Sequence, residues 1–183
     1  MGKITPEEKA QRSRKRMIDV ARQSQIGTYT RSVVAPLFQK MIRAEAAALP
    51  AGPCVVIVNG EVGQVVRQVG QCACVTCGAI GPWKGNYLGG GVIETGHFVP
   101  SRRASVLFEP TNAHPQCKFC NRHLSGNQGV YEMWMRAVFG QDEIDRLRRL
   151  KNETRNFTHE ALVDMRLTYT ERLKAAEERM QND

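Results

Sequence analysis

Two segments of the chain carry apolar residues at helical spacing. In the first, over 32–49, apolar side chains recur every three or four positions, at Val33, Leu37, Met41, Ala44 and Ala48. The sequence Pro-Ala-Gly-Pro at 50–53 prevents that helix from continuing. In the second segment, Thr158 is the expected N-cap of a final helix. Its apolar stripe comprises Leu162, Met165, Tyr169, Leu173, Ala176 and Met180. Such a stripe either covers a core or pairs with a second subunit.

Between these helices the pattern changes to short apolar runs and then to frequent glycine. Residues 54–58 and 61–66 are typical of two strands, joined by Asn59 and Gly60, which tolerate the positive φ of a type I′ turn. Glycine is frequent from 78 to 96, which predicts loop with short strands at best. Helices are predicted again over 129–139 and 142–151, separated by Gly140. The mixture predicts an α+β fold.

The predicted organisation has three parts. Residues 1–53 form a basic N-terminal arm and helix, residues 54–140 form the β-hairpin and a cysteine-containing core, and residues 141–183 form a C-terminal helical extension. The first 16 residues hold six Lys and Arg residues against Glu7 and Glu8. This composition predicts a frayed arm or a helix that orders on DNA.

Composition and charge narrow the class of protein. Hydrophobic residues make up 42% of the chain and charged residues 24%, as in folded soluble proteins. The net charge of +8 favours a polyanionic partner, above all nucleic acid, because Lys and Arg release counterions from phosphates. A solvated basic surface is the alternative. No apolar run approaches the roughly 20 residues that span a bilayer, and the first residues are polar, so a cytoplasmic protein without a membrane partner is expected.

Four of the six cysteines form two Cys-x-x-Cys pairs, Cys74 with Cys77 and Cys117 with Cys120. In a reducing compartment disulfides are disfavoured, whereas four thiolates on two such turns complete a tetrahedral Zn²⁺ site. Cys72 is a minor alternative ligand, and thioredoxin-like redox chemistry is the alternative function. A site closed by four sulfurs has no open coordination position. The zinc is therefore expected to be structural, and catalysis would need a second metal.

Histidine and asparagine residues lie inside the segment that the cysteine pairs enclose and directly after it. The order is His97, Asn112, and then Asn121 directly after the second pair. This arrangement resembles the HNH (ββα-metal) endonuclease superfamily, with His97 and Pro100 similar to its His-x-x-Pro element and Asn112 to its central Asn. The resemblance implies a zinc-stapled ββα-metal core within the α+β fold, flanked by the hairpin and by N-terminal and C-terminal helices.

A closer resemblance covers residues 72–173. The strings Cys-Val-Thr-Cys-Gly, Gly-His-Phe, His-Pro-Gln-Cys-x-x-Cys-Asn-Arg, Ser-Gly-Asn and Lys-Asn-Glu-Thr-Arg-x-Phe-Thr are similar to phage NinG/Rap recombination nucleases. The resemblance implies a phage protein, at work in the host cytoplasm, that cuts branched DNA such as Holliday junctions and D-loops. It also suggests a second copy of the chain and recombination proteins as partners. The first 70 residues lie outside it.

The chemistry of phosphodiester hydrolysis suggests a role for His97, Asn112 and Asn121. It needs a base that deprotonates water and a cation that neutralises charge on the phosphorane and on the departing 3′ oxygen. His97 suits the base, provided that a carbonyl holds one ring nitrogen. Asn112 is expected to be a scaffold whose amide bonds backbone across the loop, with an ordinary turn asparagine as the alternative. Asn121 directly follows the second cysteine pair, which resembles endonuclease VII, a relative of the NinG/Rap family. The resemblance implies that Asn121 is a candidate ligand of Mg²⁺ or Mn²⁺.

One position departs from the superfamily pattern. Many HNH sites have Asp or His immediately before the catalytic histidine, where this chain has Gly96. Glu94 is the nearest carboxylate and is the expected replacement ligand, with a solvated carboxylate as the alternative. Strand alternation would send Glu94 and His97 to opposite faces, so a bend or bulge at Gly96 is expected. His114 and His123 are secondary candidates, either for metal or phosphate contact or for structural hydrogen bonds.

Positive side chains near this segment are expected to clamp DNA phosphates. They are Lys84, Arg102, Arg103, Lys118 and Arg122. Trp83, Trp134 and Tyr131 are candidates for stacking on unpaired bases, although buried packing is the stronger expectation for the last two. The motifs predict a metal-dependent endonuclease that leaves 5′-phosphate ends, and the resemblance to NinG/Rap nucleases implies that it is specific for branched DNA structures. An HNH nickase for restriction or DNA packaging, and a non-catalytic zinc-containing DNA-binding protein, are the alternatives.

Overall fold

The computed structural model describes residues 5–22, 25–84, 93–100 and 104–182. The helices are α1 (Pro6–Arg22), α2 (Ile26–Tyr29), α3 (Ala35–Ala47), α4 (Ala104–Leu107), α5 (Gln128–Leu150) and α6 (His159–Asn182). Shorter helical turns are η1 (Thr30–Val34), η3 (Pro110–Asn112) and η4 (Phe119–His123). The strands are β1 (Gly52–Val58), β2 (Glu61–Arg67), β3 (Gln71–Ala73), β4 (Ile80–Pro82), β5 (Ile93–His97) and β6 (Ala113–Cys117).

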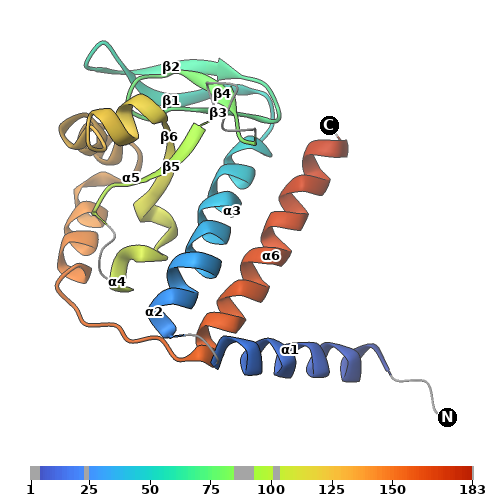
Figure 1. Ribbon diagram of the computed structural model, residues 1–183. Helices are drawn as coiled ribbons and strands as arrows, with labels where there is room; N and C mark the ends of the chain where they lie inside the picture. Colours follow the sequence, from blue (N-terminus) through green and yellow to red (C-terminus); the bar gives the residue numbers. More distant parts are fainter. Residues whose placement is uncertain (1–4, 23–24, 85–92, 101–103, 183) are drawn as a thin grey trace.

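The described strands form three separate two-stranded antiparallel sheets, β1–β2, β3–β4 and β5–β6. Figure 1 shows α3 and α6 side by side, with β1–β2 and β3–β4 at one end of this helix pair and α1 extending from the other end. In the same view β5, β6 and α5 lie beside α3, on the side away from α6. The α+β class predicted from the sequence is therefore confirmed. Most residues of the main buried cluster come from helices.

The main core lies between α3 and α6 and includes residues from β3 and β5. The apolar stripe predicted on the final helix faces this core: Leu162 and Ala176 are fully buried, and Tyr169 lies 5.3 Å from Phe38 of α3 between ring centroids. Each large apolar side chain buried in this way contributes about 1.5–3 kcal/mol. Of the two alternatives for the stripe, covering the core is the one that the structure displays.

A second apolar cluster joins α5 to the hairpin and to the segments around the β5–β6 sheet. The Trp134 indole N–H of α5 donates to the Val55 carbonyl of β1 at 2.7 Å, which fastens the hairpin to the helix. Gly140 has φ 81° and ψ 174°, so α5 is broken where the sequence predicted a boundary between two helices. A side chain with a Cβ would disfavour this backbone conformation.

Local signals of the sequence agree with the structure at two further points. Asn59 and Gly60 have φ values of 52° and 82°, as a type I′ hairpin turn requires. Thr158 caps α6, because its hydroxyl accepts a hydrogen bond from the Ala161 N–H at 3.1 Å. The expected single helix over 32–49 is wrong at its start, since helical structure begins at Ile26 and passes through the π-helical turn η1 before α3.

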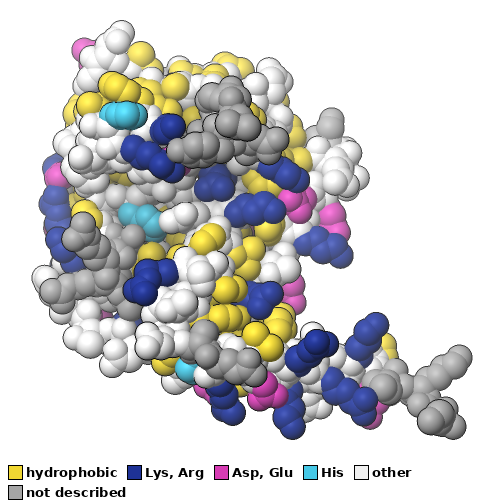
Figure 2. Space-filling view, viewed as in Figure 1, with side chains coloured by type: hydrophobic (Ala, Val, Ile, Leu, Met, Phe, Trp, Pro, Cys, Tyr) yellow, Lys and Arg dark blue, Asp and Glu magenta, His cyan; other side chains and the backbone are white. Residues whose placement is uncertain are grey.

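The basic segment at the start of the chain is helical from Pro6 onwards. Only Ile18 and Ala21 of α1 are buried. Arg14 forms an ion pair with Asp164 of α6 at 2.8 Å, and Arg22 forms one with Glu160. Figure 2 shows Lys and Arg side chains along α1 and over the face on which α3 and β5 lie. α1 is thus attached to α6 from its middle to its last residue, while most of its side chains are exposed.

Candidate metal centre and active site

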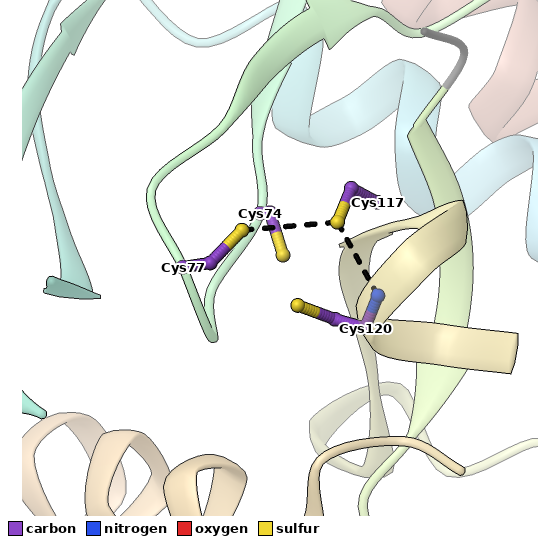
Figure 3. Close-up of side chains that lie close together, drawn as sticks. All are labelled: Cys74, Cys77, Cys117 and Cys120. Atoms are coloured by element: carbon purple, nitrogen blue, oxygen red, sulfur yellow. Dashed lines mark hydrogen bonds between the residues drawn. The ribbon is translucent and has the colours of Figure 1, made fainter. Parts of the chain in front are cut away.

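The four paired cysteines converge on one point. Figure 3 shows Cys74 and Cys77, from the turn after β3, facing Cys117 at the end of β6 and Cys120 of η4. Their sulfur atoms all lie within 4.8 Å of one another, and the Cys77 and Cys117 sulfurs are 3.7 Å apart. A tetrahedral site with Zn–S bonds of roughly 2.3 Å places its sulfurs roughly 3.8 Å apart. The four cysteines therefore fit a metal ion such as Zn²⁺.

Tight turns bring the thiols together. In the first turn, the Gly78 N–H donates to the Cys74 carbonyl at 2.8 Å, and Gly78 has φ 73°. In the second, the Cys120 N–H points to the Cys117 sulfur at 3.4 Å. Cys72 lies outside the group: its buried thiol donates to the carbonyl of Arg43 at 3.2 Å. The minor alternative in which Cys72 replaces Cys74 therefore receives no support.

Hydrogen bonds connect the cysteine cluster with Gln116 of β6, which packs against β5. The Gln116 amide donates to the Thr76 hydroxyl at 3.1 Å and to the Gly126 carbonyl at 2.9 Å. The Thr76 hydroxyl also forms a hydrogen bond with the Cys74 sulfur, 3.3 Å away, and would donate it to a metal-bound thiolate, which has no proton of its own. Gln116 is fully buried, and its side chain lies against Gly96 of β5. Metal-binding thiolates are commonly oriented by partners of this kind.

The same glutamine explains why position 96 has no metal-binding side chain. A Cβ placed on Gly96 would lie 1.9 Å from Gln116 Oε1 and 2.7 Å from its Cδ. In addition, the Tyr131 hydroxyl donates to the Gly96 carbonyl at 3.2 Å. The space that an Asp or His would need is therefore filled from β6.

His97 ends β5 and is partly buried between α3 and the segment that follows α4. Its Nε2 lies 3.2 Å from the Leu107 carbonyl, and its ring centroid is 6.4 Å from that of Phe38. Within the described part of the chain no group bonds the other ring nitrogen, Nδ1. Burial lowers the pKa of His97. The imidazole is therefore neutral at pH 7, with one nitrogen held by a carbonyl, as a general base requires.

Asn112 fixes the backbone on both sides of the loop between β5 and β6. Its Oδ1 accepts from the Val99 N–H at 2.7 Å, and its Nδ2 donates to the carbonyls of Val99 and Val106 at 3.0 Å. The side chain is fully buried. These are the hydrogen bonds expected of a scaffold. They hold the chain immediately after His97.

Glu94 and Asn121 meet at the edge of β5. The Asn121 amide lies 2.8 Å from Glu94 Oε2, and Arg122 forms an ion pair with the same carboxylate at 2.6 Å. Burial raises the pKa of Glu94, but Arg122 and Asn121 outweigh burial, so the net pKa lies below its usual value. A cavity of about 320 Å³ opens here, lined by Gln39, Arg43, Glu94, Thr95, Asn121 and Arg122. The sequence did not single out Gln39, Arg43 or Thr95.

The bend or bulge expected at Gly96 is wrong. Pairing between β5 and β6 runs without interruption from Ile93 opposite Cys117 to His97 opposite Ala113. Glu94 and His97 therefore leave opposite faces of the strand, and His97 does not line the cavity. His97 is on the same strand face as Thr95, which does line the cavity. The two residues are two positions apart, or about 6.6 Å along the strand.

The two secondary histidines lie elsewhere. His114 packs against Trp134, with ring centroids 4.6 Å apart, and its Nε2 lies 2.9 Å from the Thr111 carbonyl. Burial lowers the pKa of His114 to about 4. This placement favours the structural alternative. His123 is exposed and stacks on Phe119 at 5.7 Å, away from the residues that line the cavity.

The predicted phosphate clamps are dispersed. Lys84 lies 3.8 Å from Glu177 and over the Trp83 ring. Lys118 is exposed beside the second cysteine pair, and Arg122 contacts Glu94 as described. Arg102 and Arg103 lie outside the described residues. The three candidate stacking residues, Trp83, Trp134 and Tyr131, are each at most 7% exposed, which favours packing for all three.

A four-cysteine cluster beside a small antiparallel sheet and a helix pair defines an α+β protein with a candidate metal centre. The chain belongs to the family described as "Bacteriophage Lambda NinG protein", whose sequence profile matches residues 51–179. The resemblance to phage NinG proteins, drawn from the sequence strings, is thus confirmed as family membership. The matched region begins just before the hairpin and leaves α1 to α3 outside.

Curated relatives agree with this membership. The chain is similar to proteins named Protein ninG from Escherichia phage lambda, Escherichia phage 933W and Enterobacteria phage VT2-Sa. Each is 29% identical over 104 residues, which amount to 55% of this chain and 46% of the relative. The chain thus spans about half the length of these relatives. No solved structure is significantly similar to it. Among its described helices, none has the length and apolar character to cross a bilayer.

Proposed function

We propose that the protein is a metal-dependent DNA endonuclease of the HNH type, held together by a structural Zn²⁺. The observation that carries the proposal is the meeting of Glu94 and Asn121 in a polar cavity beside the strand that ends in His97. Two antiparallel strands followed by a helical turn, β5, β6 and η4, have the order of a ββα-metal motif. His97 ends the first strand, and Asn121 lies on the helical turn.

The residues of the cavity suit a hard divalent cation. Carboxylate and amide oxygens are the ligands that Mg²⁺ and Mn²⁺ prefer, and Glu94 is held ionised by its neighbours. Rotation of the Asn121 amide would present its oxygen to the same space. A bound cation would supply charge neutralisation on the phosphorane and on the departing 3′ oxygen. To bind the cation, the Glu94 carboxylate would have to give up one of its contacts with Arg122.

His97 would take the proton from the attacking water. Its lowered pKa keeps the ring neutral, and the Leu107 carbonyl fixes the ring orientation through Nε2, which leaves Nδ1 as the proton acceptor. Asn112 keeps the following backbone in place through its three hydrogen bonds. With the proton removed by His97 and the 3′ oxygen as leaving group, the products carry 5′-phosphate ends.

The proposed substrate is DNA, with branched DNA such as Holliday junctions and D-loops as the preferred form. The net charge of +8 supports a polyanionic partner, and the preference for branches rests on the resemblance to phage recombination nucleases. One observation favours a second candidate. Because Glu94 and His97 leave opposite faces of an unbroken strand, a zinc-containing DNA-binding protein without catalysis also fits the geometry.

Plasmid nicking with Mg²⁺, Mn²⁺ or EDTA separates the two candidates. The nuclease predicts nicking by the wild type with either metal, none with EDTA, and a loss of at least about 100-fold in His97→Ala. His159→Ala, on the first turn of α6, is the matched control and should nick normally. Binding without nicking by the folded, zinc-loaded wild type would leave only the DNA-binding candidate.

Cleavage of junction, flap, nicked and linear duplex substrates tests the preference for branches. The proposal predicts faster cleavage of junctions than of linear duplex at the same salt concentration. Equal rates on all four substrates would contradict the branched-DNA part and would favour a less selective HNH nickase.

A further inference from the structure

Arg43 of α3 extends from outside the family-matched region to the candidate active site. Its Nε donates to the Trp83 carbonyl at 3.3 Å, and its Nη1 donates to the Thr95 hydroxyl of β5 at 3.1 Å. Thr95 in turn donates to the Gln39 carbonyl of α3 at 2.8 Å. These bonds hold the guanidinium in one orientation, beside the cavity that Glu94 and Asn121 also line.

The positive charge of Arg43 has only neutral hydrogen-bond partners. Throughout the described ranges no carboxylate lies within ion-pair distance of it, and Glu94 is already bonded to Asn121 and Arg122. Burial lowers the pKa of Arg43, yet a guanidinium stays charged at neutral pH. Attraction to Cys72 and to the Glu94 carboxylate opposes the effect of burial only in part, and neither group forms an ion pair with Arg43. A partly buried cation without an ion pair is costly. Such an arrangement indicates a site for an anion that binds from solution.

The geometry of the guanidinium suits a phosphate. Nη2 makes no hydrogen bond to any described residue, so a donor remains on the group that lines the cavity. Arginine binds phosphate oxygens through its planar set of N–H groups, and Arg122 supplies a second cation on the same cavity. A cavity of about 320 Å³ has room for one phosphodiester together with a hydrated cation.

We propose that Arg43 binds a non-bridging oxygen of the DNA phosphate that is cleaved, so that α3 forms part of the active site. This inference rests on the proposed nuclease function, and it adds a residue that precedes the family-matched region. Arg43 would stabilise the charge that accumulates on the phosphorane. The competing explanation is that Arg43 only joins α3 to β5, and the test must separate the two.

The first measurement is the single-turnover cleavage rate of Arg43→Gln and Arg43→Lys. Loss of one donor to the transition-state charge predicts a fall of about 100-fold or more in Arg43→Gln. Arg43→Lys keeps a charge without the planar donors and should fall less, by about 10-fold. Lys40→Gln is the matched control on the preceding turn of α3, because Lys40 does not line the cavity. It should cleave within about threefold of the wild type. Zinc content and melting temperature establish that each variant is folded.

The second measurement compares DNA binding in Ca²⁺, without cleavage, after the cleaved bond has been mapped. A neutral methylphosphonate at that bond removes the negative charge and one acceptor oxygen. The wild type should bind this DNA about 10-fold more weakly than normal DNA, as expected for one charge-assisted hydrogen bond. Arg43→Gln, or Arg43→Lys if the glutamine variant does not fold, should show a clearly smaller difference. A purely structural Arg43 would leave the difference unchanged.

The outcomes separate this inference from the proposed function. If the wild type cleaves DNA and folded Arg43→Gln cleaves within about threefold of it, the role of Arg43 is refuted and the nuclease stands. Equal methylphosphonate effects in wild type and variant would also refute it. If the folded, zinc-loaded wild type does not cleave with Mg²⁺ or Mn²⁺, the nuclease proposal fails and the Arg43 proposal fails with it.

Discussion

Adding one methyl group at Gly96 should destabilise the fold strongly. The new Cβ would lie 1.9 Å from Oε1 and 2.7 Å from Cδ of Gln116, so the glutamine must move. Gln116 is fully buried and donates to Thr76 and Gly126, and a displaced side chain loses both hydrogen bonds. Each bond contributes about 1 kcal/mol net, and overpacking a buried site costs about 1–3 kcal/mol. Gly96→Ala should therefore lower the free energy of unfolding by about 3–5 kcal/mol.

Urea unfolding at a fixed zinc concentration measures this loss, because bound metal shifts apparent stability. Gly129→Ala is the matched control: it lies in the first turn of α5, and an added Cβ meets nothing within 4 Å. That change should be neutral or slightly stabilising. Gln116→Ala removes the obstacle, so Gly96→Ala should cost much less in that background. Strict additivity in the double variant, or a cost below about 0.5 kcal/mol for Gly96→Ala alone, would refute this account of Gly96.

Three further predictions concern neighbouring groups. Thr76→Val should weaken Zn²⁺ binding about 10-fold in competition with a chelator, because Cys74 loses a hydrogen bond; unchanged affinity would contradict that role. Asn112→Ala should lower the free energy of unfolding by about 3 kcal/mol, since the backbone groups of Val99 and Val106 lose their hydrogen-bond partners. Asn121→Ala, at the partly exposed cavity edge, should lower the same free energy by clearly less; an equal loss in the two variants would contradict the scaffold role of Asn112. The pKa of His114 is about 4, below its usual value, so unfolded chains bind more protons between about pH 6.5 and 4. The free energy of unfolding should thus fall as pH is lowered through this range, and the fall should be smaller in His114→Gln.

The features that the sequence predicted well depend on residues close together in the chain. The Asn59-Gly60 turn, the Thr158 cap and the break at Gly140 each follow from backbone preferences of one or two residues. The two Cys-x-x-Cys turns are also local, and only their meeting across 40 positions required the assumption of a shared metal. Local chemistry of this kind can be recognised without knowledge of the fold.

The features that the sequence missed depend on contacts between distant segments. Gly96 was expected to allow a bulge, whereas it makes room for Gln116 from the paired strand. Arg43 and Gln39 lie four positions apart on α3, so the sequence places them on one face of that helix. The spacing indicates that both side chains lie on one face of α3, but it does not reveal that this face packs against β5. Only the packing of α3 against the β5–β6 sheet brings Arg43 to the cavity.

Residues of the candidate active site are adjacent in sequence to the cysteine cluster or pack against its neighbours, and this determines the role that a bound zinc can have. Asn121 directly follows Cys120, and Gln116 directly precedes Cys117, so a metal that fixes the sulfurs also fixes both neighbours. Gln116 in turn occupies the space beside Gly96, one residue before His97. A four-sulfur site has no open position for water. If zinc binds here, its contribution to the proposed catalysis is therefore positional: it would set where η4 meets β5, and thereby whether Asn121 and Glu94 face the same cavity.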